Sequence, residues 1–234
     1  AHQDQPSISF ASGRQSLYAV LKALKIGEGD EVIIQAYTCI VVPHAVIWSG
    51  AKPVYADIDG SLNIDVTSAE RLLTPRTKAL IVQHTFGVPA DMDSIMSFCK
   101  KHGLLLIEDC AHALGASYDG KPVGTLGDAA IFSFGRDKII SSVSGGMATA
   151  KDGLVAARLR SIQSSSPYQP RVRVLQNLLH PILVPFFTSL MPLAGLGSLL
   201  LRMTQGIGLL NKVYTSQELA SVPPEHKTEQ LPEA

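Results

Sequence analysis

Short apolar runs alternate with segments of helical periodicity along the first two thirds of the chain. The runs cover residues 31–36, 77–83, 104–108 and 129–132. Between them, apolar side chains recur every three or four positions, as they do in 91–102. Strands that alternate with helices in this way predict an α/β fold, with a mainly parallel sheet flanked by helices.

Polar or aromatic residues stand where several of these predicted strands end. They are Tyr37, His84, Asp109 and Ser133. Parallel α/β sheets bind their ligands outside the carboxyl ends of the strands. We therefore expect these side chains to converge on one ligand site.

A lysine completes this set. Lys138 follows the run 129–132, and Asp109 follows the run 104–108, so two neighbouring strands each deliver one ionisable group. This pair suits pyridoxal phosphate, whose aldehyde bonds to a lysine amine and whose pyridine nitrogen stays protonated beside a carboxylate. The pair is weak evidence by itself, because many α/β strands end in Asp or Lys.

An anion site is predicted near the N-terminus. Ser12 and Gly13 stand a few residues before the helical pattern of residues 17–24. The N–H groups of a first helical turn lack partners within the helix, and the helix dipole is positive there. A phosphate could therefore bind at Gly13, Arg14 and Gln15, although an ordinary helix cap explains the same residues.

Composition and spacing exclude several classes of protein. With 20 basic and 20 acidic residues the net charge is zero, which argues against nucleic-acid binding. Three widely spaced cysteines favour neither a zinc ribbon nor a disulfide framework, and they suit a reducing compartment. Asp57 and Asp59 fit solvated turn carboxylates better than a metal site. No G-x-G-x-x-G motif follows the first strand, so a nucleotide-dependent dehydrogenase is disfavoured.

Several motifs in a fixed order resemble the sugar-nucleotide aminotransferases of the DegT/StrS type. They are Asp-Cys-Ala-His at 109–112, Val-Gly-Thr-Leu-Gly-Asp at 123–128, Ser-Phe at 133–134 ahead of Lys138, and Gly-Gly at 145–146. The resemblance covers about residues 8–165. It implies the aspartate-aminotransferase fold (fold type I) with a pyridoxal-phosphate-binding large domain at 1–165.

The resemblance implies a role for each residue around the cofactor ring. Lys138 would be the Schiff-base lysine and the acid and base of the reaction. Asp109 would pair with the pyridine nitrogen, and His112 would lie near the cofactor's O3′ or pack there as a structural histidine.

Phosphate binding and ring stacking are implied in the same way. Ser133 and the amides of Arg14 and Gln15 would bind the phosphate. The family places an aromatic residue at the position of Cys39, where it stacks on the ring. Here the aromatic residue is Tyr37, so either Tyr37 reaches over or a small Cys39 leaves the ring less covered.

The implied activity is transamination, because a lysine is present where a related set of dehydratases has histidine. The amino group would pass from glutamate to a nucleotide-linked keto sugar in polysaccharide or amino-sugar biosynthesis, in a cytoplasmic homodimer. The alternative is a catalytically incomplete, membrane-associated relative with a binding or regulatory role, peripheral to or anchored in the inner membrane.

The C-terminal part differs from the rest of the chain. Residues 174–201 contain no Asp, Glu, Lys or Arg, and they predict an apolar helical segment within a region at 166–215. Prolines and glycines interrupt it, so contact with a membrane competes with a broken helical insert packed on a dimer or on a further domain. The polar stretch 216–234 is predicted to be disordered. The family carries a small C-terminal domain, so the chain is expected to be truncated.

Overall fold

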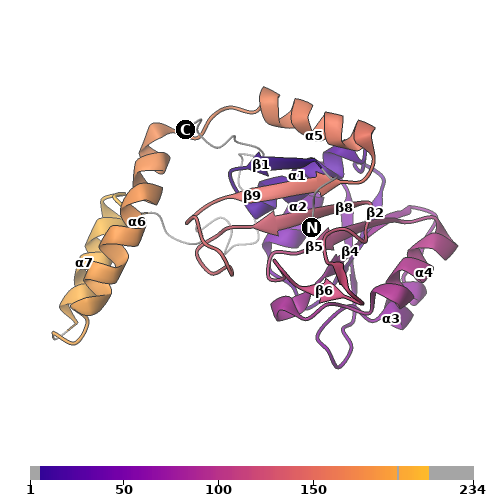
Figure 1. Ribbon diagram of the computed structural model, residues 1–234, viewed down its shortest axis with the longest axis horizontal. Coiled ribbons are helices and arrows are strands. Elements are labelled where there is room, and N and C mark those ends of the chain that lie inside the picture. The colour runs from indigo at the N-terminus through magenta and orange to yellow at the C-terminus, as the bar shows by residue number, and fades with distance from the viewer. Residues whose placement is uncertain (1–5, 194, 211–234) are drawn as a thin grey trace.

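The computed structural model describes residues 6–193 and 195–210. Its centre is a seven-stranded sheet in the order β1-β9-β8-β5-β4-β2-β3. The strands are β1 (Ser7–Phe10), β2 (Glu31–Gln35), β3 (Lys52–Ala56), β4 (Thr77–Gln83), β5 (Leu105–Asp109), β8 (Ala129–Ser133) and β9 (Gly146–Ala150). Figure 1 shows the sheet with helices on both faces, which confirms the predicted α/β class.

Most of the sheet is parallel. Strands β3, β2, β4, β5 and β8 pair in parallel, so their carboxyl ends share one edge. Strand β9 is antiparallel to β8, and β1 is antiparallel to β9. The sequence did not indicate β1, because only Ile8 and Phe10 alternate inward over its short length. A two-stranded hairpin of β6 (Ser117–Tyr118) and β7 (Lys121–Pro122) lies apart from this sheet.

The helices divide between the two faces according to which strand residues they cover. Successive residues of each strand point to opposite faces, so Ile33 and Ile34 belong to different clusters. One face carries α1 (Gly13–Ala23), α2 (Val41–Ser49) and α5 (Gly153–Ser165). The other face carries α3 (Val66–Arg71) and α4 (Met92–His102), and the short η1 (Thr85–Gly87) follows β4.

Helix boundaries follow the caps. Helix α3 begins after Asp65, because the Asp65 carboxylate accepts the N–H of Thr67. Helix α5 begins after Asp152, whose carboxylate accepts two first-turn N–H groups, and it ends at Ser165. The guanidinium of Arg158 donates to the carbonyl of Ala23, which ties α5 to the end of α1.

The apolar C-terminal segment forms two helices, α6 (Arg171–Ser189) and α7 (Leu196–Gly206). They pack on each other as a hairpin that projects from the α/β body (Figure 1). The two helices cross so closely at Gly197 that a Cβ added there would overlap the carbonyl of Phe187. Among the described residues, no helix has both the length and the apolarity needed to cross a membrane. The predicted disordered stretch 216–234 lies outside the described residues.

Candidate active site

A pocket opens at the carboxyl ends of β5 and β8, against the N-terminus of α1. It brings together most of the site residues expected from the sequence. They are Gly13, Arg14, Cys39, Asp109, His112, Ser133 and Lys138. Gln83, at the end of β4, also lines it. The shared edge of the parallel strands therefore forms the site, as the topology predicts.

The loop after β8 holds Lys138 over this pocket. The N–H of Phe134 donates to the carbonyl of Gly145 (3.0 Å), which closes the base of the loop. The hydroxyl of Ser144 donates to the carbonyl of Ala11 (2.6 Å), which ties the loop to the start of α1. The Lys138 side chain keeps 14% of its surface exposed. The amine is thus largely enclosed but still open to a ligand.

The amine of Lys138 has two side-chain neighbours. Its Nζ lies 3.0 Å from Nε2 of His112 and 3.3 Å from Oδ2 of the exposed Asp137. Burial, and then the positive charge of Lys138, lower the pKa of His112. His112 is therefore neutral near pH 7, and its Nε2 accepts a hydrogen bond from the amine.

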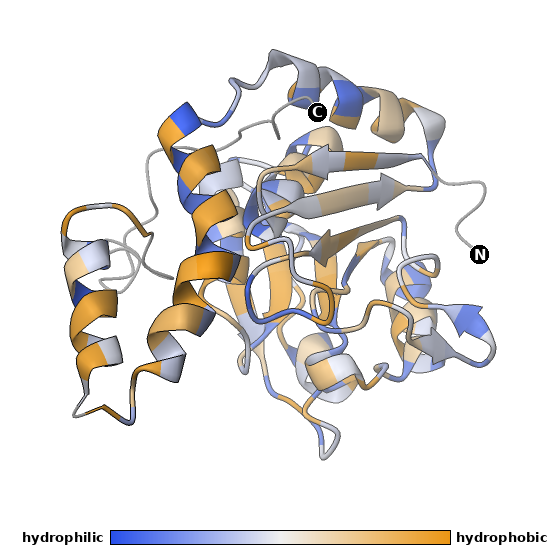
Figure 2. Cartoon of the chain, turned by 60° about the vertical axis from the view of Figure 1, so that its left-hand side comes forward, coloured by the Kyte–Doolittle hydropathy of each residue, from blue (hydrophilic) through white to orange (hydrophobic). Residues whose placement is uncertain are grey.

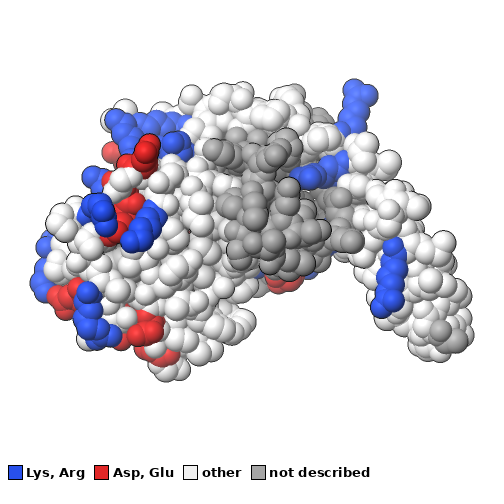
Figure 3. Space-filling view, turned by 180° about the vertical axis from the view of Figure 1, so that it is seen from behind, with Lys and Arg blue, Asp and Glu red and all other residues white. Residues whose placement is uncertain are grey.

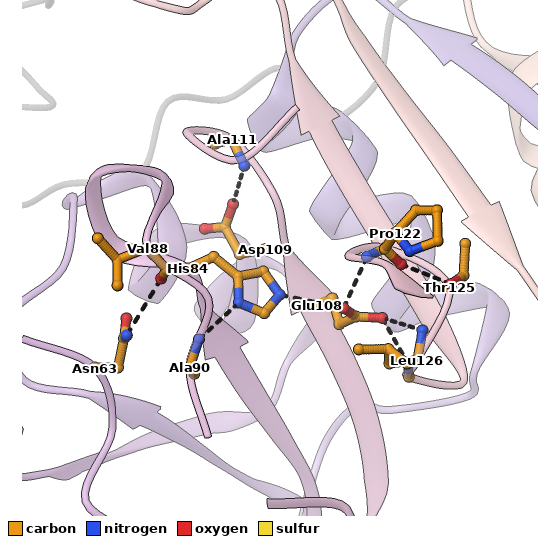
Figure 4. Close-up of polar contacts among 12 residues, drawn as sticks. Asn63, His84, Val88, Ala90, Glu108, Asp109, Ala111, Pro122, Thr125 and Leu126 are labelled. Atoms are coloured by element: carbon orange, nitrogen blue, oxygen red, sulfur yellow. Dashed lines mark hydrogen bonds and ion pairs between the residues drawn. The ribbon is translucent and has the colours of Figure 1, made fainter. Parts of the chain in front are cut away.

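Asp109 ends β5 with its carboxylate buried in the pocket wall. The N–H of Ala111 donates to its Oδ1 at 3.0 Å, as Figure 4 shows. Burial raises the pKa of Asp109, and it outweighs the opposing effects of the Ala111 hydrogen bond and of the charge on Lys138. A carboxylate whose pKa is raised by burial is stabilised as an anion by a cationic donor placed against it. The pocket therefore suits a ligand with a protonated ring nitrogen.

Glu108 precedes Asp109 on β5 and points to the other face of the sheet. Its carboxylate is buried and accepts the N–H groups of Gly124, Leu126 and Gly127 at 2.6–2.7 Å. Burial raises the pKa of Glu108, but the hydrogen bonds from His84, Gly124 and Gly127 lower it more, so the net shift is downward. Glu108 therefore anchors the 124–127 turn and takes no part in the pocket.

His84 requires a correction to the expectation from the sequence. It was expected at the ligand site, but it is fully buried and points away from the pocket to Glu108. Its Nδ1 accepts the N–H of Ala90 at 3.2 Å, so Nε2 carries the proton and donates to Glu108 at 3.1 Å (Figure 4). Both ring nitrogens are therefore occupied by structural hydrogen bonds.

The same hydrogen bonds argue against a metal ion at this place. His84, Glu108 and Cys110 bring potential ligand atoms within 4.8 Å of one another. The lone pair of His84 is already used by Ala90, and burial raises the pKa of the Cys110 thiol well above its usual value. A neutral thiol and an occupied imidazole are poor metal ligands.

The N-terminus of α1 lies directly against Ser133. A Cβ at Gly13 would lie 2.8 Å from the Cβ of Ser133, so only glycine permits this approach. Gln15 is a second correction: its N–H is accepted by Oγ of Ser12 at 3.3 Å, and it does not line the pocket. Gly13, Arg14 and Ser133 therefore line this end of the pocket, and Gln15 does not.

Of the two arrangements that the sequence left open for the aromatic cover, the structure agrees with the less covered one. Cys39 lines the pocket, whereas Tyr37 lies outside it, with its ring edge against Phe86 at a centroid distance of 6.3 Å. Phe86 in turn stacks on His112, with centroids 5.9 Å apart and planes 5° apart. Sequence reasoning missed Phe86, whose signal was its place in the short segment that follows β4 at the ligand edge of the sheet. Its φ of 53° is unusual for a side chain of this size.

Solved structures of aminotransferases share the fold that carries this pocket. An aminotransferase from Psychrobacter cryohalolentis superposes with a TM-score of 0.67 at 39% identity, covering 69% of this chain and 41% of its own. DesI, solved with its TDP-sugar product, gives a TM-score of 0.64 at 36% identity, covering 68% of this chain and 40% of its own. The fold is therefore that of the pyridoxal-phosphate-dependent sugar aminotransferases.

Curated relatives agree with this class. A UDP-N-acetyl-3-dehydro-alpha-D-glucosamine 3-aminotransferase from Acidithiobacillus ferrooxidans is 42% identical over 69% of this chain and 44% of its own length. A GDP-perosamine synthase from Caulobacter vibrioides is 44% identical over 67% of this chain and 43% of its own. The family model of the DegT/DnrJ/EryC1/StrS aminotransferases matches residues 2–178, and the chain belongs to that family. It spans less than half the length of these two relatives.

Proposed function

We propose that this chain forms the cofactor-binding part of a pyridoxal-phosphate-dependent aminotransferase that acts on a nucleotide-linked keto sugar. The observation that carries the proposal is the meeting of Lys138, Asp109 and the Gly13–Ser133 contact in one pocket. When bound, the cofactor supplies an electron sink for reactions at the carbon that bears the amino group.

The residues present fit the two ends of this cofactor. Asp109 is buried, and its raised pKa would fall back once a protonated pyridine nitrogen donated to it. At the other end, Gly13 brings the first turn of α1 against Ser133, and Arg14 lines the same wall. A helix N-terminus with a hydroxyl beside it suits a phosphate dianion.

Lys138 is the group that would exchange protons with the substrate. Its Nζ is held by the neutral imidazole of His112, which can accept a hydrogen bond but does not repel a charged amine. The stack of His112 on Phe86 fixes the plane of the imidazole. His112 therefore acts as a positioning residue, and Lys138 as the acid and base.

The substrate class rests on the relatives. Two of the most similar are named for amino transfer to a UDP-linked amino sugar and for synthesis of a GDP-linked amino sugar. Glutamate is the expected amino donor. Neither relative supports the alternative of a catalytically incomplete binding or regulatory protein.

Trapping of the cofactor tests the proposal directly. The full chain is incubated with pyridoxal phosphate, reduced with borohydride and digested, and the peptides are analysed by mass spectrometry. The label is expected on Lys138, and Lys138→Ala should abolish it. Lys151, which donates to the carbonyl of Leu126 away from the pocket, is the matched control, and Lys151→Ala should retain the label. Labelling spread over surface lysines, or unchanged in Lys138→Ala, would contradict the proposal.

Three further expectations remain proposals. The homodimer is inferred from the family, and sedimentation velocity of the purified chain would measure it. A cytoplasmic location is consistent with three free cysteines, of which Cys99 and Cys110 are buried. The third expectation is that residues 174–201, which lie in the α6–α7 hairpin, contact a membrane.

A further inference from the structure

Helix α6 leaves one apolar face uncovered. The exposed large apolar residues recur at spacings of three and four, which places them in a single stripe along the helix. They are Val172, Leu175, Leu178, Ile182 and Phe186, each with 54–66% of its surface exposed. In Figure 2 this helix is among the most apolar parts of the molecule. A stripe of this kind inside a folded protein would normally be buried.

Helix α7 repeats the pattern. Its exposed apolar residues are Leu196, Leu199 and Met203, and Ile207, which directly follows the helix, continues the spacing of three and four. The contact between the two helices uses other residues, since Phe187 and Gly197 are buried at their crossing. The two exposed rows, together called the hairpin stripes, are therefore left over after the hairpin has packed.

Charge is distributed unevenly around these stripes. The sequence has no Asp or Glu between 153 and 217, although the chain as a whole has equal numbers of acidic and basic residues. Arg171, Arg173 and Arg202 lie exposed on the hairpin. On the face drawn in Figure 3, the hairpin carries basic side chains and no acidic ones, whereas the α/β body shows both kinds.

We propose that the α6–α7 hairpin docks on the surface of an anionic lipid bilayer. The hairpin stripes would enter the boundary between headgroups and acyl chains, and the arginines would contact the anionic headgroups. Docking in the plane of the surface agrees with the absence, among the described helices, of one able to cross a membrane. Pro181 and Pro185 within α6 are no obstacle to a helix that lies along a surface.

A second copy of the chain fits the same face less well. A two-fold interface brings identical patches together. The hairpin carries arginines, and its sequence contains no acidic residue, so two copies would place like charges opposite each other. An anionic surface satisfies the apolar rows and the arginines at once.

The hairpin also lies next to the active-site loop. Burial, and then the charge of Arg136 on that loop, lower the pKa of His180 in the middle of α6. Arg136 precedes Lys138 by two residues. A docked hairpin would therefore hold the pocket close to the lipid surface, where a lipid-linked or membrane-delivered substrate is accessible.

Vesicle flotation tests the docking without any need for the cofactor. The full chain is mixed with vesicles of phosphatidylcholine alone, or with vesicles that also contain phosphatidylglycerol. Flotation is expected with the anionic vesicles only, and it should weaken at high salt because exposed charges are screened. The double substitution Ile182→Glu and Leu199→Glu, one in each stripe, should abolish it.

Two further variants separate the surface from general effects. Leu154→Glu, on the 70% exposed Leu154 of α5, is the matched control and should float like the parent chain. The pair Arg171→Gln and Arg202→Gln, one in each helix, keeps the stripes and should weaken anionic binding by about fivefold for each arginine. This pair keeps the proposal testable if the glutamate variant does not fold.

Three outcomes would overturn the proposal. The first is an absence of flotation with anionic vesicles. The second is equal binding to both vesicle types with no effect of salt. The third is a dimer in sedimentation velocity that the glutamate variant dissociates, without vesicle binding, because it would assign the stripes to a second copy.

Discussion

Two adjacent carboxylates at the end of β5 belong to opposite faces of the sheet and have opposite electrostatic surroundings. Glu108 accepts a donor from His84 and three backbone N–H groups, and its pKa is lowered. Asp109 accepts the N–H of Ala111, and burial raises its pKa. Glu108 is thus stabilised as an anion by the protein itself, whereas Asp109 is left for a cationic ligand. Burial of a carboxylate therefore does not identify a functional residue until its donors are known.

Asp109→Asn should have the largest effect on function. An amide in its place cannot compensate a buried cationic N–H, which costs about 3 kcal/mol or more. We expect the rate of the cofactor-dependent half-reaction with glutamate to fall by ~100-fold or more, as measured by stopped-flow absorbance. The stability of the cofactor-free protein should stay unchanged or rise. A large loss of that stability would show that Asp109 is structural, as Glu108 is.

Glu108→Gln should give the reverse pattern. One amide oxygen cannot satisfy the donors of Gly124, Leu126, Gly127 and His84, and the new NH₂ group points at some of them. We expect the free energy of unfolding to fall by about 3 kcal/mol, as measured by urea denaturation. Borohydride labelling at Lys138 should persist in the protein that remains folded. If stability is unaffected, the assigned role of Glu108 is wrong.

Gly124→Ala tests the turn that Glu108 anchors. Gly124 has a φ of 87°, and an added Cβ would lie 2.5 Å from Cζ of Phe132. Strain and overlap together should cost about 2 kcal/mol of stability. Gly120→Ala is the matched control, since Gly120 also has a positive φ of 73° but has open space where a methyl group would be added. The control should lose only the part of the stability that backbone strain accounts for.

The two carboxylates should give the cofactor-free protein opposite pH dependences. Glu108, with its lowered pKa, contributes stability above its unfolded pKa, and this is lost as the pH falls through its folded pKa. Asp109, with its raised pKa, contributes stability at low pH that is lost as the pH rises through its folded pKa. Urea midpoints between acid and neutral pH should therefore lose acid sensitivity in Glu108→Gln. In Asp109→Asn, the fall of the urea midpoint towards neutral pH should disappear.

His112 should give the smallest effect. His112→Gln keeps an acceptor for the amine of Lys138, whereas His112→Phe removes it and costs about 1 kcal/mol, or roughly fivefold in cofactor fixation. The quantity measured is the fraction of Lys138 labelled at limiting pyridoxal phosphate. Equal labelling of the two variants would show that the 3.0 Å contact does not position the amine.

The sequence by itself predicted the parallel strands, their ligand edge and five residues that line the pocket there, namely Lys138, Asp109, His112, Ser133 and Gly13. These are local signals, because apolar runs, helix starts and spaced motifs can be read without knowing which segments meet.

Only the tertiary structure decided where each side chain at that edge points. Gln15 is used by its own helix cap, and Tyr37 turns to Phe86. His84 binds Glu108 across the sheet from the pocket. The physical reason is that a strand end fixes the position of a residue, while donors and acceptors far away in the sequence decide which partner it takes. The same holds for the hairpin stripes, since an apolar helix becomes a docking surface only where packing leaves it exposed.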